Sequence, residues 1–116
     1  MSAIRGTTPD YILTLAGYDL TDMRVYVTIW QPGHKLTKTN DDLEITVEGS
    51  GQTLKSTIEL TLSQQETLGL TVGQASIQVK MIDSDGHVDA TEIEVIEVKK
   101  ALLEKVIAYD ATGSPA

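Results

Sequence analysis

Residues 74–98 constrain the fold more than any other stretch, because polar and apolar residues alternate along them on both sides of a turn. The turn residues are Asp83-Ser84-Asp85-Gly86, and the alternation resumes at Val88. A period of two predicts strands that bury one face, and a break containing Asp and Gly between two such strands predicts a long β-hairpin. The residues of the first strand that we expect to point inward are Ala75, Ile77, Val79 and Met81.

The second strand of this hairpin does not keep one parity. Its apolar residues change face twice, in the order Val88 and Ala90, then Ile93 and Val95, then Ile96 and Val98. A strand with a period of two cannot bury all of these side chains on one side. We therefore expect a β-bulge near Thr91 or a stretch that is buried on both sides.

Five further stretches predict strands, at residues 9–16, 23–30, 35–39, 43–47 and 54–62. After them, Ser63 and Glu66 have the spacing of a capping box, which predicts one or two helical turns ended by Gly69 or Gly73. About seven short strands with regularly spaced turns predict an antiparallel, immunoglobulin-like β-sandwich with one short crossover helix. An open β-barrel is the alternative.

A chain of 116 residues corresponds to one domain. We expect a mobile or partner-bound arm at residues 1–8, the sandwich at 9–107 and a flexible tail at 108–116. Before that tail, Leu102, Leu103, Val106 and Ile107 have partly helical spacing, and a short extended segment is the alternative. Neither a signal peptide nor a membrane span is expected.

Composition and motifs argue against several functions. A net charge of −8 would repel phosphate backbones, so no nucleic-acid partner is expected. Cysteine is absent, His34 and His87 are the only histidines, and no nucleophile elbow or phosphate-binding loop occurs. We therefore expect no catalytic residues, no metal, no cofactor and no enzymatic activity.

The turn after Ile82 partly resembles a calcium-binding loop. Asp83, Asp85, Asp89 and Glu94 have loop positions one, three, seven and twelve of an EF-hand, but Gly86 stands at position four instead of six. A hairpin turn explains the same residues, with Asp83 and Asp85 bonding local amides and Gly86 at positive φ.

The strand at 23–30 predicts an interaction surface. Met23, Val25, Val27 and Ile29 form its inward face, while the other face carries Arg24, Tyr26, Thr28 and Trp30. Two large aromatic residues on an outward face indicate that something covers them, either another element of the same chain or a partner. Arg5, in the expected arm, is included in this interface hypothesis.

Several motifs occur in an order similar to that of small phage tail-region proteins. They are Arg5-Gly6-Thr7-Thr8-Pro9, Gly17-Tyr18-Asp19-Leu20-Thr21, Val25 to Ile29, Leu62 to Leu68 and Asp83-Ser84-Asp85-Gly86. Together they resemble the N-terminal domain of phage upper-baseplate proteins, an immunoglobulin-like sandwich that anchors receptor-binding proteins at the tail tip. The long helical and receptor-binding parts of those proteins have no counterpart here, so the resemblance implies attachment to the virion.

The expected function is therefore that of a structural virion protein of the tail or baseplate, assembled in the host cytoplasm. Its expected partners are other virion proteins and further copies of itself, with no nucleic acid and no membrane. The alternatives are a capsid decoration or head fibre protein, or a module that binds carbohydrate or protein on the host surface. Such a module would use the loops Pro32 to His34 and Gly49 to Gln52.

Overall fold

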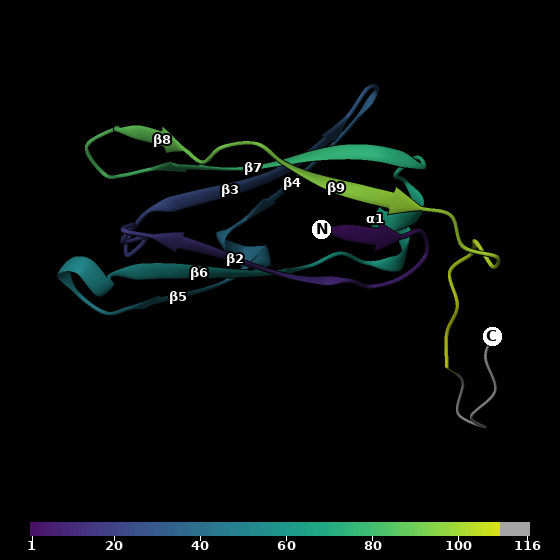
Figure 1. Cartoon of the computed structure of the whole chain (residues 1–116), viewed down its shortest axis with the longest axis horizontal. Helices are drawn as coiled ribbons and strands as arrows, with labels where there is room; N and C mark the ends of the chain where they lie inside the picture. The colour runs from purple at the N-terminus through teal and green to yellow at the C-terminus, as the bar shows by residue number, and fades with distance from the viewer. Residues whose placement is uncertain (110–116) are drawn as a thin grey trace.

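A computed structural model describes residues 1–109, which form two β-sheets stacked face to face (Figure 1). The large sheet has the order β1-β9-β7-β3-β4, with β8 also paired to β7, and the small sheet has the order β2-β6-β5. The strands are β1 (Ser2–Ile4), β2 (Asp10–Ala16), β3 (Arg24–Gln31), β4 (His34–Thr39), β5 (Glu44–Glu48), β6 (Lys55–Thr61), β7 (Gly73–Ile82), β8 (Val88–Ala90) and β9 (Glu94–Lys99). The helices are the 3₁₀ turns η1 (Asn40–Asp42) and η2 (Gly51–Thr53) and the α-helix α1 (Gln64–Leu68).

This strand order is that of an immunoglobulin fold. The series β2-β6-β5 corresponds to strands B, E and D of that fold, and β9-β7-β3-β4 corresponds to G, F, C and C′. The predicted immunoglobulin-like sandwich is confirmed, and the alternative of an open barrel is wrong because the strands form two separate sheets. One detail differs: β1 pairs with β9 in parallel, so the large sheet is mixed and not wholly antiparallel.

The core lies between the sheets and is built by the alternation seen in the sequence. β3 and β7 bury every second residue against β6, as their apolar parity predicts. Ser56 of β6 is a buried polar residue in this core, and its hydroxyl donates to the carbonyl of Tyr18 at 2.7 Å and accepts from the amide of Leu20 at 3.1 Å. This pair of bonds ties the connection between β2 and β3 to the small sheet.

The hairpin of β7, β8 and β9 contains the predicted irregularity. β8 pairs Ala90 with Lys80, whereas β9 pairs Glu94 with Ile77, so four steps on the returning chain oppose three on β7. One extra residue is accommodated around Thr91, whose amide donates to the Val79 carbonyl at 2.9 Å. The bulge near Thr91 is confirmed, and it explains the changes of parity.

The capping box at α1 is also confirmed. The Ser63 hydroxyl accepts from the amide of Glu66 at 3.1 Å, and the Glu66 carboxylate accepts from the amide of Ser63 at 2.8 Å. Lys38 adds an ion pair to the same carboxylate at 2.8 Å. Burial opposes ionisation of Glu66, but the bonds from Lys38 and Ser63 outweigh it and hold the pKa of Glu66 below its usual value.

The expectation of a mobile arm is wrong for the start of the chain. Ser2–Ile4 forms β1, and Ala3 is buried in the core. Three residues are too few to show a period in the sequence, and their partner strand lies more than 90 residues away along the chain. β1 therefore belongs to the large sheet.

The chain that follows β9 leaves the sandwich without forming a helix. Residues 100–108 have no regular secondary structure, and the apolar side chains of Leu102, Leu103, Val106 and Ile107 are exposed. Of the expected tail, Ala108 and Tyr109 are exposed, and residues 110–116 lie outside the described part of the chain. No helix within residues 1–109 is long and apolar enough to cross a membrane.

Candidate functional site

The outer surface of the large sheet carries four of the five predicted interface residues. Arg24, Tyr26, Thr28 and Trp30 point outward from β3, while Val25, Val27 and Ile29 between them are buried. Trp30 is 49% exposed and Tyr26 37%, so no described element of the chain covers this surface. The explanation that another part of the same chain covers it is therefore wrong for residues 1–109.

Neighbouring strands extend this surface on both sides. Trp30 lies opposite Lys35 on β4 and Ser76 on β7, and Tyr26 lies opposite Lys80 on β7. A shallow, mainly apolar pocket of about 340 Å³ adjoins Trp30, and its lining residues are Thr28, Trp30, Ser76, Ile77, Gln78 and Ile93. We call the outer surface formed by Arg24, Tyr26, Thr28, Trp30, Lys35, Lys80, Ile93 and Val95 the aromatic face.

Sequence reasoning had not placed Ile93 and Val95 on this surface. Ile93 is 62% exposed and Val95 46%, and Val95 lies opposite Ser76 beside Trp30. Their conflicting parity on the return strand is the sequence signal that could have identified both. The bulge at Thr91 turns them outward and so widens the apolar part of the aromatic face.

The aromatic face is basic, although the chain as a whole is acidic. Arg24, Lys35 and Lys80 are all exposed, and in residues 1–109 none of them forms an ion pair. Glu97 and Lys99 also point outward, from β9 toward the β1 edge, and their charges offset one another. The three central cations therefore remain available to a partner.

Arg5, the fifth predicted residue, lies apart from the aromatic face. Its guanidinium donates to the carbonyls of Leu68 and Leu70 at 2.9 and 2.8 Å, and it pairs with the Glu104 carboxylate at 2.6 Å. The two carbonyl bonds fix the chain just after β1 to the end of α1 and to the residues that follow it. The structure gives Arg5 an internal role, and its place in an interface stays a prediction.

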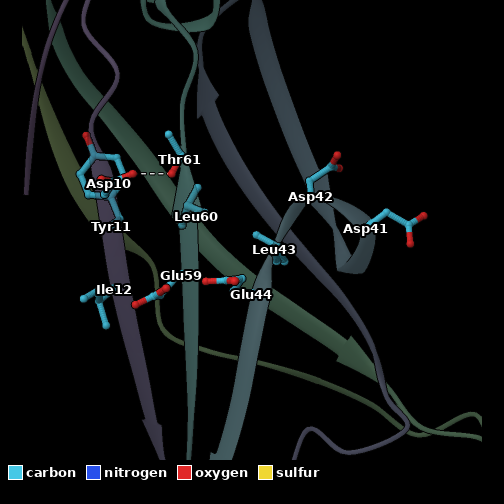
Figure 2. A pocket seen from close by; sticks show the side chains of 10 residues that line it. All are labelled: Asp10, Tyr11, Ile12, Asp41, Asp42, Leu43, Glu44, Glu59, Leu60 and Thr61. Carbon is cyan, nitrogen blue, oxygen red and sulfur yellow. Dashed lines mark hydrogen bonds between the residues drawn. The ribbon is translucent and has the colours of Figure 1, made fainter.

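The outer surface of the small sheet has the opposite charge. A pocket of about 590 Å³ opens there, and Figure 2 shows its ten lining residues, with the carboxylates of Glu44 and Glu59 directed toward one another. We call it the acidic pocket; its five carboxylates come from Asp10, Asp41, Asp42, Glu44 and Glu59. Ile12 and Leu43 supply apolar lining between them, while the side chain of Leu60 is buried in the core.

Register explains why these carboxylates meet. Glu44 lies directly opposite Glu59 in the pairing of β5 with β6, and Asp10 lies opposite Thr61 in the pairing of β2 with β6. A hydrogen bond with Glu44 raises the pKa of Glu59 most, and desolvation and the negative charges of Glu44 and Asp10 raise it further. Asp41, Asp42 and Glu44 are close together in the sequence, whereas Asp10 and Glu59 lie on distant strands.

The β7–β8 turn has the geometry predicted for a hairpin. One Asp83 carboxylate oxygen accepts from the amides of Asp85 and His87 at 2.9 and 3.0 Å, and Gly86 has φ +89°. The backbone bond from His87 is the main cause that lowers the pKa of Asp83, and the bond from Asp85 adds to it. Asp83, Asp85 and His87 lie close enough to share a cation, but the hydrogen bonds within the turn explain why they cluster.

The two loops considered for ligand binding lie at opposite ends of the sandwich (Figure 1). Pro32 and Gly33 follow β3, whose last residue Gln31 bonds to Thr71 just after α1. Gly49 to Gln52 precede β6, at the end of the small sheet far from α1. These two loops therefore do not form one binding site.

No known protein family matches this sequence, and no curated protein matches it. Among solved structures, 17 chains are similar. The SrpA adhesin R347E mutant from Streptococcus sanguinis is 14% identical with a TM-score of 0.44, over 95% of this chain and 60% of the adhesin chain. AggA, the major subunit of aggregative adherence fimbriae type I from Escherichia coli, is 9% identical with a TM-score of 0.41, over 86% of this chain and 89% of AggA. Similarity this low carries no information on function.

Proposed function

We propose that this protein is a structural component of a virion, in the tail or baseplate of a phage, and that it acts by binding other proteins and not by catalysis. The observation that carries the proposal is the aromatic face, which none of residues 1–109 covers. Tyr, Trp and Arg are the residues most enriched at the energetic centres of protein interfaces. The aromatic face combines Arg24, Tyr26 and Trp30 on one strand.

The scaffold beneath this face suits assembly. Val25, Val27 and Ile29 are at most 1% exposed and anchor β3 from within, and β3 is paired on both sides by β4 and β7. A rigid sheet loses little conformational entropy when it docks, so more of the contact energy remains for affinity. A capsid decoration or head fibre protein would use the same surface in the same way.

The virion as the place of assembly rests on the resemblance to phage tail-region proteins, and the host cytoplasm would be where the particle is built. A module that binds carbohydrate or protein on the host surface receives less support. Its two candidate loops lie at opposite ends of the sandwich, and neither contains an aromatic residue.

Peptide mass spectrometry of purified phage particles from the source lysate tests the proposal. We expect peptides of this chain in the particles, at a copy number far below that of the major capsid protein. A copy number comparable with that of the capsid protein would indicate instead that the chain lies on the capsid surface. Absence from particles would overturn the proposal.

A matched pair of variants tests the aromatic face in the same assay. Trp30→Ala removes a half-exposed indole at its centre, and we expect a loss of about 2 kcal/mol or more in binding and little incorporation into particles. Val72→Ala is the control, because Val72 is 59% exposed in the loop before β7 and lies outside the face. Equal incorporation of both variants, each folded by circular dichroism, would count against this surface.

A further inference from the structure

We propose that the aromatic face docks on the acidic pocket of a second copy of this chain, so that copies associate head to tail. The inference rests on the proposed function, which makes the aromatic face a binding surface, and it adds the identity of the occupant. Two surfaces of the same molecule are complementary in charge, and this complementarity identifies the second copy as the occupant.

The two surfaces carry opposite charge at their centres. Arg24, Lys35 and Lys80 stand around Tyr26 and Trp30 on the aromatic face. Five carboxylates line the acidic pocket, and none of its lining residues is basic. Lys55, on the outer side of β6, lies opposite Glu48 at the end of the strand far from Glu59. Attraction between such surfaces favours encounter and fixes orientation.

A cationic partner would stabilise the acidic pocket by reducing the repulsion between its carboxylates. Glu44 and Glu59 lie directly opposite one another across the sheet, where two like charges repel. A hydrogen bond with Glu44 raises the pKa of Glu59 most, and desolvation and the negative charges of Glu44 and Asp10 add to it. An arginine or lysine placed between Glu44 and Glu59 would offset this repulsion. Apolar lining from Ile12 and Leu43 matches an aromatic side chain, and Trp30 and Tyr26 are the side chains that the other surface offers.

The geometry of the sandwich dictates how copies would associate. The two sheets bury their inner faces against each other, so the aromatic face and the acidic pocket point away from one another (Figure 1). An interface between two different surfaces is heterologous, and its repetition gives a ring or an open stack. A two-fold symmetric dimer would instead oppose cations to cations or carboxylates to carboxylates.

Charge exchange tests this pairing directly. The first variant, Arg24→Glu with Lys80→Glu, makes the aromatic face acidic. The second, Asp41→Lys with Glu44→Lys and Glu59→Lys, leaves two carboxylates against three lysines and so makes the acidic pocket basic. Sedimentation velocity of the wild-type protein should show oligomers that dissociate as salt is raised. Each variant alone should associate at least about tenfold more weakly, because its two surfaces then have the same sign.

Mixing the two variants provides the decisive measurement. Each surface of one variant is then complementary to a surface of the other, so oligomers should return only in the mixture. Trp30 is the single tryptophan, and its emission should shift to the blue as the mixture assembles. If the first variant loses association while the second keeps it, the aromatic faces pair with each other and the inference is overturned.

The inference and the proposed function fail in different ways. A wild-type chain that is monomeric at all concentrations, with no association in the mixture, overturns the inference. The proposed function survives that result if Trp30→Ala still prevents incorporation into particles, because another virion protein then occupies the face. Head-to-tail oligomers of a chain that is absent from particles would support the inference and overturn the proposed function.

Discussion

Glu59 and Glu44 lie directly opposite each other on the outer side of the small sheet, where both are exposed to water. Cross-strand pairs of like charge destabilise a sheet. Because the fold raises the pKa of Glu59, the folded state binds its proton more tightly than the unfolded chain does. Protonation of Glu59 therefore stabilises the folded state. This stabilisation is fully present below the ordinary pKa of a glutamate, and it is lost as the pH rises through the raised pKa of Glu59.

Glu59→Gln should therefore stabilise the fold at neutral pH, because the amide removes the repulsion. The gain should shrink as the pH falls through the raised pKa of Glu59, and it should be gone below the ordinary glutamate pKa, where the wild-type residue is protonated in both states. Thermal unfolding at neutral and at acid pH, at protein concentrations low enough to keep the chain monomeric, measures both effects.

Glu48→Gln is the matched control for this prediction. Glu48 lies on the same strand as Glu44 but faces Lys55, so its replacement removes an attraction and should not stabilise the fold at neutral pH. A gain for Glu59→Gln that is equal at both pH values would show that charge repulsion is not its cause.

At the scale of the elements, β1 is held by contacts that could not be predicted from its own three residues. The Arg5 amide donates to the carbonyl of Lys99, and Arg5 binds the backbone after α1. Thr67 of α1 is fully buried, and its hydroxyl donates to the carbonyl of Thr7 at 2.8 Å and accepts from the amide of Gly6 at 3.0 Å. The short crossover helix thus anchors the start of the chain.

Thr67→Val should loosen β1 and leave the rest of the fold in place. Valine keeps the shape of threonine but leaves two backbone groups without their partner, which costs about 1–3 kcal/mol. Hydrogen exchange should rise at the amides of Arg5 and Gly6, and at Glu97, whose amide donates to the carbonyl of Met1. Thr46→Val, at an exposed site on β5, should change neither stability nor exchange at β1. Unchanged exchange at β1 in Thr67→Val would contradict this anchoring role.

At the scale of the whole molecule, both sheets contribute to one hydrophobic core. Its buried residues come from six strands and the connections between them, with Tyr11, Ile58 and Leu60 from the small sheet and Val27, Ile77 and Val79 from the large one. Neither sheet can shield the apolar side chains of its inner face from water without the other. This mutual burial predicts that the domain unfolds in a single cooperative step.

Two probes of denaturant unfolding check this prediction. Emission of Trp30 reports on the outer side of the large sheet, and far-ultraviolet circular dichroism reports on the strands of both sheets. The two transitions should have the same midpoint and the same slope. Separate midpoints would mean that one sheet survives without the other.

The sequence by itself determined the local structure of this protein. Alternation along β3 and β7 identified the buried faces, and conflicting parity located the bulge at Thr91. The spacing of Ser63 and Glu66 predicted α1, and the outward row from Arg24 to Trp30 marked the aromatic face. All of these are encoded between residues close in the chain, where the period of a strand or a helix fixes which side chains share a face.

Only the tertiary structure decided which distant segments meet. The parallel pairing of β1 with β9, the internal bonds of Arg5 and the gathering of Asp10, Glu44 and Glu59 depend on strand order and register. Local periodicity states that a residue points outward, but it does not state what lies beside it. The opposite charge of the two outer surfaces therefore became visible only when the two sheets were in place.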